Sequence, residues 1–326
     1  GGGATAPPAG AAVGGEAVPE PAVATGGATA STGGSTTPQM NKPPDIIEAE
    51  KSYMWVSWLG RMDKKFIGLH NTPPWTPYEG DDMILNHSGV VIPPEPDRGH
   101  NLFDSFSDAA SGYPDYTRIP TIGNSVSITV NLGNPGASCG CNVALFLLSM
   151  PSSEVNSWGG DYCDANCVGG KCCAELDLIE ANVHVLQSTS HPCSDYKTPP
   201  AASEKLACNA RGESFVKFGN GAIDFGPGPQ YTINSQEPFV YRIDFPTESG
   251  VLKGYITVSQ GGKELKGSIP SLESMRAPLS DGMVLSLSSW YASDMTWLDG
   301  GSGCQKPEEC NIQSAFFDHL VVEQLP

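Results

Sequence analysis

The chain has 326 residues, with 18 basic and 36 acidic side chains and a formal net charge of −18. This acidity argues against nucleic acids and anionic membrane surfaces as partners, because phosphate groups bind basic surfaces. The sequence also lacks an apolar run of the roughly 18–20 residues that a membrane-spanning helix requires. Neutral or cationic partners remain compatible with the composition.

Residues 1–44 consist almost entirely of Gly, Ala, Pro, Thr and Ser. Such a segment cannot bury enough apolar surface to offset its chain entropy, so we expect a disordered tail or linker. Residues 45–326 are long enough for one large domain. Because no signal peptide is visible, we expect a mature or trimmed product.

Short segments with strand character recur along the second part of the chain, separated by Gly, Pro and Asn. They lie at 126–130, 143–150, 174–186, 214–218, 239–245, 254–259, 282–290 and 316–325. No long stretch has helical periodicity, so the pattern predicts an all-β fold, either a β-sandwich or a β-barrel. Residues 46–120 give a weaker signal: 52–60 fits a strand, and 100–113 fits a short helix or a loop.

Ten cysteines all lie after residue 138, and seven of them fall between 139 and 193. Their short spacings are CxC, CxxxC and CC, whereas zinc sites favour paired CxxC motifs. We therefore expect disulfides and a secreted protein rather than a metal site. The sequon Asn86-His87-Ser88 is compatible with secretion and glycosylation.

Three carboxylates stand within six residues in the segment CCAELDLIEAN. Strand side chains alternate, so Glu175 and Asp177 share one face while Glu180 should point to the other. A β-bulge between Asp177 and Glu180 would turn all three to the same face. The alternative is an ordinary half-exposed strand, which also alternates acidic and apolar residues.

Two carboxyl groups about 5–5.5 Å apart are what a retaining glycosidase needs, one as nucleophile and one as acid/base. Glu175 and Glu180 could flank a bound sugar linkage in this way. Asp177 would hydrogen-bond one of them, and mutual repulsion would raise the pKa of the acid.

The sequence around these acids resembles glycoside hydrolase family 7, the cellobiohydrolases and endoglucanases that cut β-1,4-glucan. CCAELDLIEAN…HPC is similar to the active-site strand of that family. Three further segments resemble family motifs in the same order: SCGCNVALFLLSM, DYCDANC and GMVLSLSSW…MTWLD, at 138–150, 161–167 and 282–299. The resemblance covers roughly residues 125–326, and it implies a jelly-roll β-sandwich of two curved antiparallel sheets with a substrate cleft.

The resemblance also implies roles for individual residues. Glu175 matches the nucleophile, Asp177 the assisting aspartate and Glu180 the acid/base. His191 matches a histidine close to the acid/base and is counted with the catalytic residues. The matching substrate-binding residues are Asp164 and Asn166 in the loop and the sugar-stacking Trp290 and Trp297. An ordinary loop histidine and buried core tryptophans are the alternatives for His191, Trp290 and Trp297.

The disulfide pairing implied by the resemblance is Cys163–Cys173, Cys167–Cys172, Cys193–Cys208 and Cys139–Cys304. Cys141 and Cys310 have no family partner and are left for each other. Two of these bridges would hold the loop 161–167 against the start of the acidic strand.

The chain also departs from the family pattern. Phe146 replaces a tyrosine, Asn166 replaces a glutamine, and two aspartates are missing before Tyr291. The arginines of the product sites have no counterpart in 299–304 or near Cys208. These departures leave the three acids intact and bear on the preferred glucan and the mode of cleavage.

We therefore expect a secreted, monomeric hydrolase of internal β-1,4-glucosidic bonds in a β-glucan polysaccharide, acting with retention and without metal or cofactor. Short connections after the acidic strand predict an open cleft. One rival is a β-1,3- or mixed-linkage glucanase like glycoside hydrolase family 16, which also uses E-x-D-x-x-E. Another is a non-catalytic polysaccharide-binding protein on the same fold.

Overall fold

The computed structural model describes residues 53–69, 84–85, 89–92, 98–103, 116–133, 137–150, 162–168, 171–194, 208–292, 295–304, 310 and 315–326. The tail predicted at 1–44 and the sequon at 86–88 lie outside the described residues. The division into a tail and a single domain of residues 45–326 therefore stays a prediction.

Strands dominate the described residues. The first ten are β1 (Tyr53–Trp58), β2 (Arg61–Leu69), β3 (Ile84–Leu85), β4 (Gly89–Ile92), β5 (Arg98–Phe103), β6 (Arg118–Ile119), β7 (Asn124–Asn131), β8 (Cys141–Leu148), β9 (Glu175–Asn182) and β10 (Val185–His191). The others are β11 (Ser214–Gly219), β12 (Phe225–Gly226), β13 (Ile233–Asn234), β14 (Phe239–Asp244), β15 (Thr247–Glu248), β16 (Val251–Leu252), β17 (Gly254–Gln260), β18 (Lys263–Ile269), β19 (Met283–Tyr291) and β20 (Ala315–Gln324).

The described helices are short: η3 (Glu273–Met275), α2 (Arg276–Asp281), α3 (Thr296–Asp299) and η4 (Gly300–Ser302). Among the residues that the structure describes, no helix is long and apolar enough to cross a membrane.

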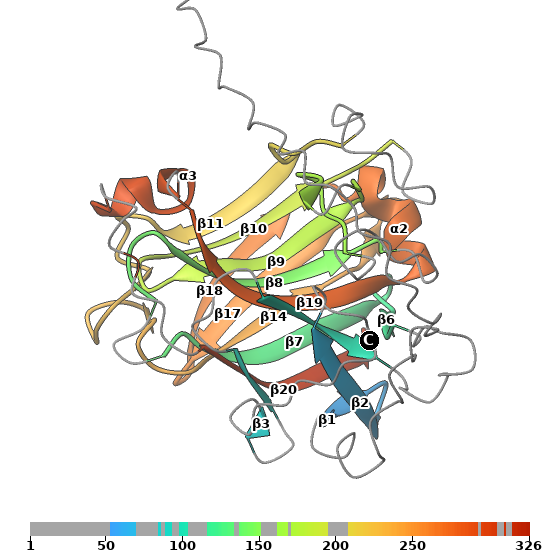
Figure 1. Ribbon diagram of the computed structural model, residues 1–326, viewed down its shortest axis with the longest axis horizontal. Coiled ribbons are helices and arrows are strands. Elements are labelled where there is room, and N and C mark those ends of the chain that lie inside the picture. Colours follow the sequence, from blue (N-terminus) through green and yellow to red (C-terminus); the bar gives the residue numbers. More distant parts are fainter. Residues whose placement is uncertain are drawn as a thin grey trace, which may run out of the picture. The chain divides into compact units, whose positions relative to one another are not determined.

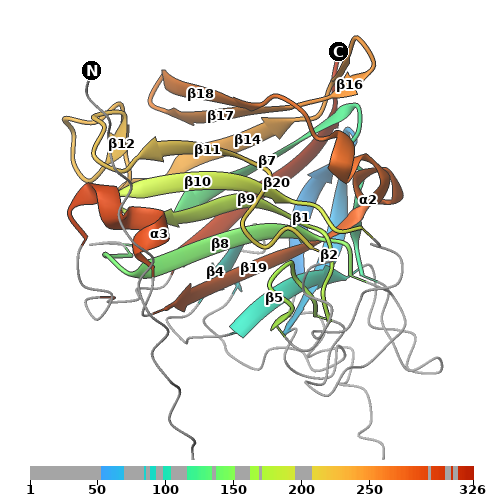
Figure 2. The same cartoon turned by 90° about the horizontal axis from the view of Figure 1, so that it is seen from above.

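The strands form two packed layers that are joined through one hydrogen-bonded path, β11-β10-β9-β8-β19-β5-β2-β1-β20-β7-β14-β17-β18. We call β11, β10, β9, β8 and β19 the acid-bearing sheet, and β20, β7, β14, β17 and β18 the outer sheet. Figure 1 looks onto the acid-bearing sheet, and Figure 2 shows the outer sheet behind it. Within each of these sheets neighbouring strands are antiparallel. The fold is a β-sandwich of jelly-roll type, as predicted.

Alternation in the sequence explains the strands of the outer sheet. In β7, Val126, Ile128 and Val130 are buried in the core that fills the space between the layers. Successive strand residues point to opposite faces, so the residues between them face away from this core. The strands predicted at 126–130, 239–245 and 254–259 are confirmed as β7, β14 and β17.

The segment predicted as one strand at 174–186 is instead a hairpin, with β9 ending at Asn182 and β10 beginning at Val185. The side-chain oxygen Oδ1 of Asn182 accepts a hydrogen bond from the backbone N–H of His184 at 2.9 Å. This local bond stabilises a turn, which is why the chain reverses within an otherwise apolar run.

Two contacts show how closely the layers approach. The hydroxyls of Ser188 on β10 and Tyr241 on β14 are 3.0 Å apart. On β18, a Cβ atom at Gly267 would lie 2.3 Å from Cγ1 of Val216 on β11, so only glycine fits there. Val216 therefore points from the acid-bearing sheet into the core between the layers.

Candidate active site

The acidic strand β9 contains an irregularity between Asp177 and Glu180. Opposite β10, Glu180 pairs with Gln187 and Asp177 pairs with Thr189, so two residues of β9 face one of β10. The pairing of β9 with β8 shifts register at the same place. The predicted bulge is confirmed, and it lies inside the E-x-D-x-x-E motif.

The bulge brings the three carboxyl groups to one face of the sheet. Directly paired residues of an antiparallel ladder lie on the same face. The pairs are Glu175 with His191, Asp177 with Thr189, and Glu180 with Gln187. Between these β10 residues, Ser188 points the other way, toward Tyr241 of the outer sheet. All three acids therefore point away from the core between the layers.

Glu180 is held from the neighbouring strand β8. Its Oε1 accepts a hydrogen bond from Nδ2 of Asn142 at 2.9 Å. The amide of Asn142 is itself fixed, because its Oδ1 accepts the backbone N–H of Ala181 at 3.1 Å. Only 5% of Glu180 is exposed, so this carboxyl group has one defined orientation.

Asp177 and His191 share a proton. Oδ2 of Asp177 lies 2.9 Å from Nε2 of His191, and Nδ1 of His191 lies 2.9 Å from the carbonyl oxygen of Asn209. A carbonyl only accepts, so Nδ1 donates, and a further proton lies between Nε2 and Oδ2. Oδ1 of Asp177 is buried and has no hydrogen-bond partner among the described residues.

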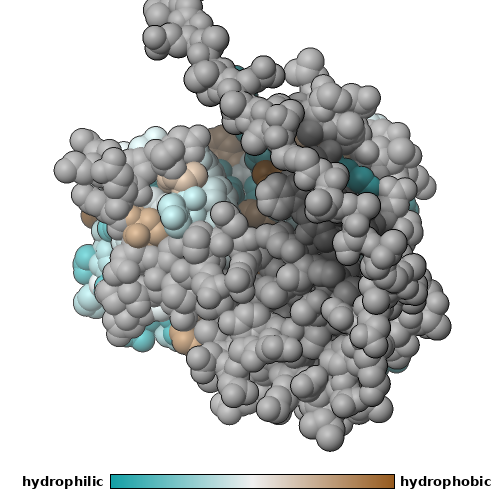
Figure 3. Space-filling view, in the orientation of Figure 1, coloured by the Kyte–Doolittle hydropathy of each residue, from teal (hydrophilic) through white to brown (hydrophobic). Residues whose placement is uncertain are grey.

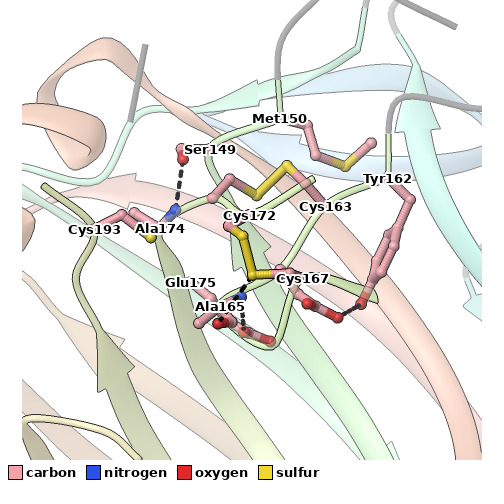
Figure 4. Close-up of a disulfide and its surroundings, with 12 residues drawn as sticks. Ser149, Met150, Tyr162, Cys163, Ala165, Cys167, Cys172, Ala174, Glu175 and Cys193 are labelled. Atoms are coloured by element: carbon pink, nitrogen blue, oxygen red, sulfur yellow. Dashed lines mark hydrogen bonds between the residues drawn. A yellow bond between two sulfur atoms is a disulfide. The ribbon is translucent and has the colours of Figure 1, made fainter. Parts of the chain in front are cut away.

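Glu175 meets a loop that two disulfides hold in place (Figure 4). Its Oε2 accepts the backbone N–H of Ala165 at 2.8 Å. The bridges Cys163–Cys173 and Cys167–Cys172 tie both sides of Ala165 to the residues that lead into β9. The loop 162–168 thus supplies a fixed N–H donor to the first acid of the motif.

The same loop adds a fourth buried carboxyl group. Asp164 accepts hydrogen bonds from the Tyr162 hydroxyl at 3.1 Å and from the Val168 N–H at 2.9 Å. Its parallel bridge with Cys172 places it beside the entrance to β9. Tyr162 is drawn beside the two disulfides in Figure 4.

Burial raises the pKa values of all four carboxyl groups, because charge is poorly solvated inside the protein. The pKa of Glu180 rises to about 7, with opposing effects from Asn142, His191 and Lys217. The pKa of Asp164 rises to about 6. Burial together with neighbouring carboxylates raises the pKa values of Glu175 and Asp177 well above the usual range. The cluster therefore holds protons near neutral pH.

Two tryptophans lie side by side near the end of the sheet where β9 finishes. The ring centroids of Trp290 on β19 and Trp297 on α3 are 6.5 Å apart, with an interplanar angle of 28°. Trp290 pairs with Asn142 across the ladder, so it shares the face of Glu180. Trp297 is 43% exposed, which leaves an aromatic surface open at this edge.

Helix α3 is anchored to the sheet by its last three residues. Oδ2 of the buried Asp299 accepts hydrogen bonds from Nδ2 of Asn182 at 2.9 Å and from the N–H of Gly140 at 2.8 Å. Nζ of Lys217 donates to the carbonyl oxygens of Trp297 and Leu298 at 3.2 and 3.0 Å. These contacts fix the backbone that carries Trp297 relative to β9 and β11.

All five predicted disulfides are present: Cys139–Cys304, Cys141–Cys310, Cys163–Cys173, Cys167–Cys172 and Cys193–Cys208. One group of three potential metal ligands occurs among the described residues: Cys139, His184 and Cys304. Its two sulfur atoms are bonded to each other, so it offers no thiolate pair to a metal ion.

Most of the residues predicted for the site converge. Glu175, Asp177, Glu180, His191 and Asp164 are all buried around β9, and the two tryptophans stand together at its end. Asn166 differs: it is exposed at the turn of the loop. Its predicted contact with substrate stays a prediction.

The sequence analysis missed the residues that hold the acids. Glu180 is contacted by Asn142, and Asp164 by Tyr162. Asp177 is paired with Thr189, and α3 is contacted by Lys217. The sequence carried no alternation signal for Thr189, because every residue of β10 from 187 to 191 is polar. Figure 3, in the orientation of Figure 1, shows that the described residues visible on this face are mainly hydrophilic, with isolated hydrophobic ones.

Known proteins resemble this chain in sequence and in fold. The glycosyl hydrolase family 7 model matches residues 168–263. An endo-beta-1,4-glucanase, celB, of Aspergillus oryzae is 30% identical over 222 residues, which cover 50% of this chain and 53% of that protein. Endoglucanase EG-1 of Hypocrea jecorina is 28% identical over 232 residues, covering 58% of this chain and 48% of that protein.

The alignments thus span about half the length of the curated relatives. A solved endocellulase (EG 1) of Humicola insolens aligns with a TM-score of 0.67 and 19% identity, over 84% of this chain and 96% of that one. This structural likeness shows the fold. Together the matches confirm the resemblance to family 7 that the motifs predicted.

Proposed function

We propose that this chain, a relative of the family 7 glycoside hydrolases, hydrolyses β-1,4-glucosidic bonds in a β-glucan with retention of configuration. The observation that carries the proposal is the bulge in β9, which turns Glu175, Asp177 and Glu180 to one face of the sheet. An ordinary half-exposed strand would not bury three acids on a single face. Two carboxyl groups across one sugar linkage are the requirement for this reaction.

In the first step Glu175 attacks the anomeric carbon while Glu180 protonates the oxygen of the departing sugar. The bond between the anomeric carbon and that oxygen breaks, and a glycosyl ester of Glu175 forms. The raised pKa of Glu180, about 7, keeps this acid largely protonated below neutral pH and partly protonated at pH 7. Attack requires the carboxylate form of Glu175. The charge of nearby His191 and the N–H of Ala165 favour that form, against the burial and the neighbouring carboxylates that raise its pKa.

In the second step the Glu180 carboxylate takes a proton from water as the water oxygen attacks the anomeric carbon. The ester bond to Glu175 breaks, and the sugar leaves with its original configuration. His191 keeps Asp177 oriented between the two glutamates. The unpaired Oδ1 of Asp177 is available for a hydrogen bond to Glu175 or to a sugar hydroxyl.

The tryptophan pair supports a sugar substrate. Flat indole faces suit the apolar faces of glucose rings, and Trp297 offers such a surface to solvent. Five disulfides favour an oxidising compartment, so we propose that the protein acts outside the cell. We propose a monomer that uses neither metal nor cofactor, because the two carboxyl groups supply the whole reaction.

The test is hydrolysis of cellulose, lichenan and laminarin, followed by proton NMR of the first product from cellopentaose. We expect release of reducing sugar from cellulose and lichenan, and a β-anomer that appears before mutarotation. Preference for laminarin would favour a β-1,3-glucanase, and an initial α-anomer would contradict retention. Binding to all three glucans without reducing-sugar release would identify a polysaccharide-binding protein.

We propose internal cleavage rather than release from chain ends. Only 20 residues separate Cys193 from the start of β11 at Ser214, and 17 separate Trp297 from β20. These segments are too short to enclose a polysaccharide chain from this side. The viscosity of carboxymethyl cellulose should fall steeply after few cuts, whereas steady release of cellobiose at constant viscosity would contradict internal cleavage.

A further inference from the structure

Strand β11 carries a large aromatic side chain that the proposed reaction does not use. Phe215 is 66% exposed, although it is paired within a regular antiparallel ladder as the second residue of β11. Exposing an aromatic ring of this size leaves apolar surface in water, which is unfavourable unless a partner covers it. The position of the ring in the sheet indicates that partner.

The register places Phe215 on the same face as the acids. Phe215 pairs with Thr189 on β10, and Thr189 pairs with Asp177 on β9. The next residue, Val216, points the other way, since its side chain packs against Gly267 of the outer sheet. Alternation along β11 therefore directs Phe215 away from the core, toward the side of the sheet that holds the carboxyl groups.

The strand order then places Phe215 and Trp290 on opposite flanks of the acids. In the sequence β11-β10-β9-β8-β19, each of these aromatic residues lies two strands from β9. Two strand spacings amount to about 10 Å. A ligand that contacts both flanks must therefore extend across the whole sheet and pass over the three acids. Figure 1 shows these five strands side by side, with β11 at one edge.

We propose that Phe215 is a sugar-binding platform on the β11 flank, stacking against a pyranose ring of the same β-glucan that the acids cleave. This proposal rests on the proposed function and extends the binding surface to the edge opposite Trp290. The phenyl ring is apolar and uncharged, so it suits the C–H face of a neutral sugar. Lys217, next on this face, is already engaged by the carbonyl oxygens of α3.

The experiment compares Phe215→Ala and Phe215→Trp with wild type on cellotriose to cellohexaose. Loss of one stacking contact should raise KM for the longest oligosaccharides about three- to tenfold. The turnover number kcat should stay within twofold of wild type, roughly, because the ring does not touch the reacting atoms. The effect should shrink as the substrate becomes too short to reach β11, and Phe215→Trp should restore the KM.

Val240→Ala is the matched control. Val240 is exposed on β14 of the outer sheet. Its neighbour Tyr241 faces the core, so Val240 faces solvent on the opposite side of that sheet. Its substitution should leave KM unchanged at every length. An unchanged KM in Phe215→Ala, or a rise of equal size at every length, would overturn the platform.

Binding measurements separate this proposal from the proposed function. Cellohexaose should bind the Glu175→Gln protein in calorimetry, and adding Phe215→Ala should weaken that binding by the same three- to tenfold, roughly. If wild type does not hydrolyse any β-glucan, the proposed function fails, and the platform fails with it. If wild type is active but Phe215→Ala binds normally, the platform alone is wrong.

Discussion

The two sheets of this protein bury their strands in different ways. In β14 of the outer sheet, buried residues alternate with half-buried or exposed ones, as expected for a sheet with one face against the core. In β8, β9 and β10 of the acid-bearing sheet, every residue is buried. The acid-bearing sheet therefore has a second buried face, and this face carries the carboxyl groups.

The chemical content of the two sheets differs in the same way. The second face of the acid-bearing sheet gathers Asn142, Gln187, Thr189, His191 and the acids, all buried. Burying polar groups costs free energy unless they are hydrogen-bonded, and burying charge costs more. The core between the layers is mainly aliphatic and aromatic. Most of the free energy that stabilises the fold thus comes from that core. The raised pKa values of the acids show that burying their ionised forms is unfavourable.

The largest expected effect concerns the acids themselves. Glu175→Gln and Glu180→Gln should each lower kcat by at least about 10³-fold, because the nucleophile or the proton donor is lost. Glu180→Ala should regain turnover with azide, giving a β-glycosyl azide, since a small anion needs no base. Near-UV circular dichroism should show that the fold is kept. Near-normal activity in either Gln variant would contradict the assigned roles.

Two disulfides should affect stability and activity in different proportions. Cys139–Cys304 closes a loop of 165 residues and Cys167–Cys172 a loop of 5. By chain entropy, replacing both cysteines with Ser should cost about 5 kcal/mol for the long loop and about 2 kcal/mol for the short one.

Activity should follow the opposite order. The short bridge holds Ala165 against Glu175, so its removal should lower kcat at temperatures where the protein is still folded. The measurement is urea unfolding and turnover of both double variants. Equal activity losses would mean that the loop does not position Glu175.

The pH dependence of stability follows from the raised pKa values. Glu180 takes up its proton near pH 7 in the folded protein and near 4.5 when unfolded, so the folded state binds more protons between these values. The free energy of unfolding contributed by this group is therefore greatest below about pH 4.5 and falls as the pH rises through 7. Asp164 acts in the same direction up to about pH 6.

Glu180→Gln removes this titration. The variant should gain stability relative to wild type at pH 8, by about 1–3 kcal/mol and a few degrees in Tm, with little gain at pH 4.5. Asp244→Asn on the outer sheet is the control, because Asp244 is ion-paired with Arg242 and should lose a contact at both pH values. A Tm gain for Glu180→Gln that is the same at both pH values would contradict burial as its cause.

The smallest expected effect concerns the hydrogen bond between Tyr241 and Ser188, which joins the two sheets. Tyr241→Phe removes the hydroxyl that contacts Ser188 and should lower the free energy of unfolding by about 1 kcal/mol. Because Ser188 still donates to the carbonyl oxygen of Leu178, the bulge should persist and KM should not change. Altered kinetics in this variant would show that the interlayer contact supports the acids.

Local spacing in the sequence was sufficient to predict the bulge in β9. Three acids at positions 175, 177 and 180 can share a face only if one residue is inserted between the last two, and the structure contains that bulge. The family resemblance implied the β-sandwich and four of the five disulfides, and the fifth, Cys141–Cys310, joins the two cysteines that were left over. The hairpin at 182–185 was missed because Asn182 stands alone, with no Gly or Pro beside it, in a segment of continuous strand character.

Contacts between distant segments were decided by the tertiary structure alone. Asn142 reaches Glu180 across 38 positions of the chain, and Lys217 reaches Trp297 across 80. Strand pairing brings such residues together. The alternation of residues within one strand does not predict which strands will be its neighbours in the sheet. The sequence by itself therefore identified the three acids and the bulge that would let them share a face. The packed sheets decided that the bulge forms, which side chains hold the acids, and how far the exclusion of water raises their pKa values.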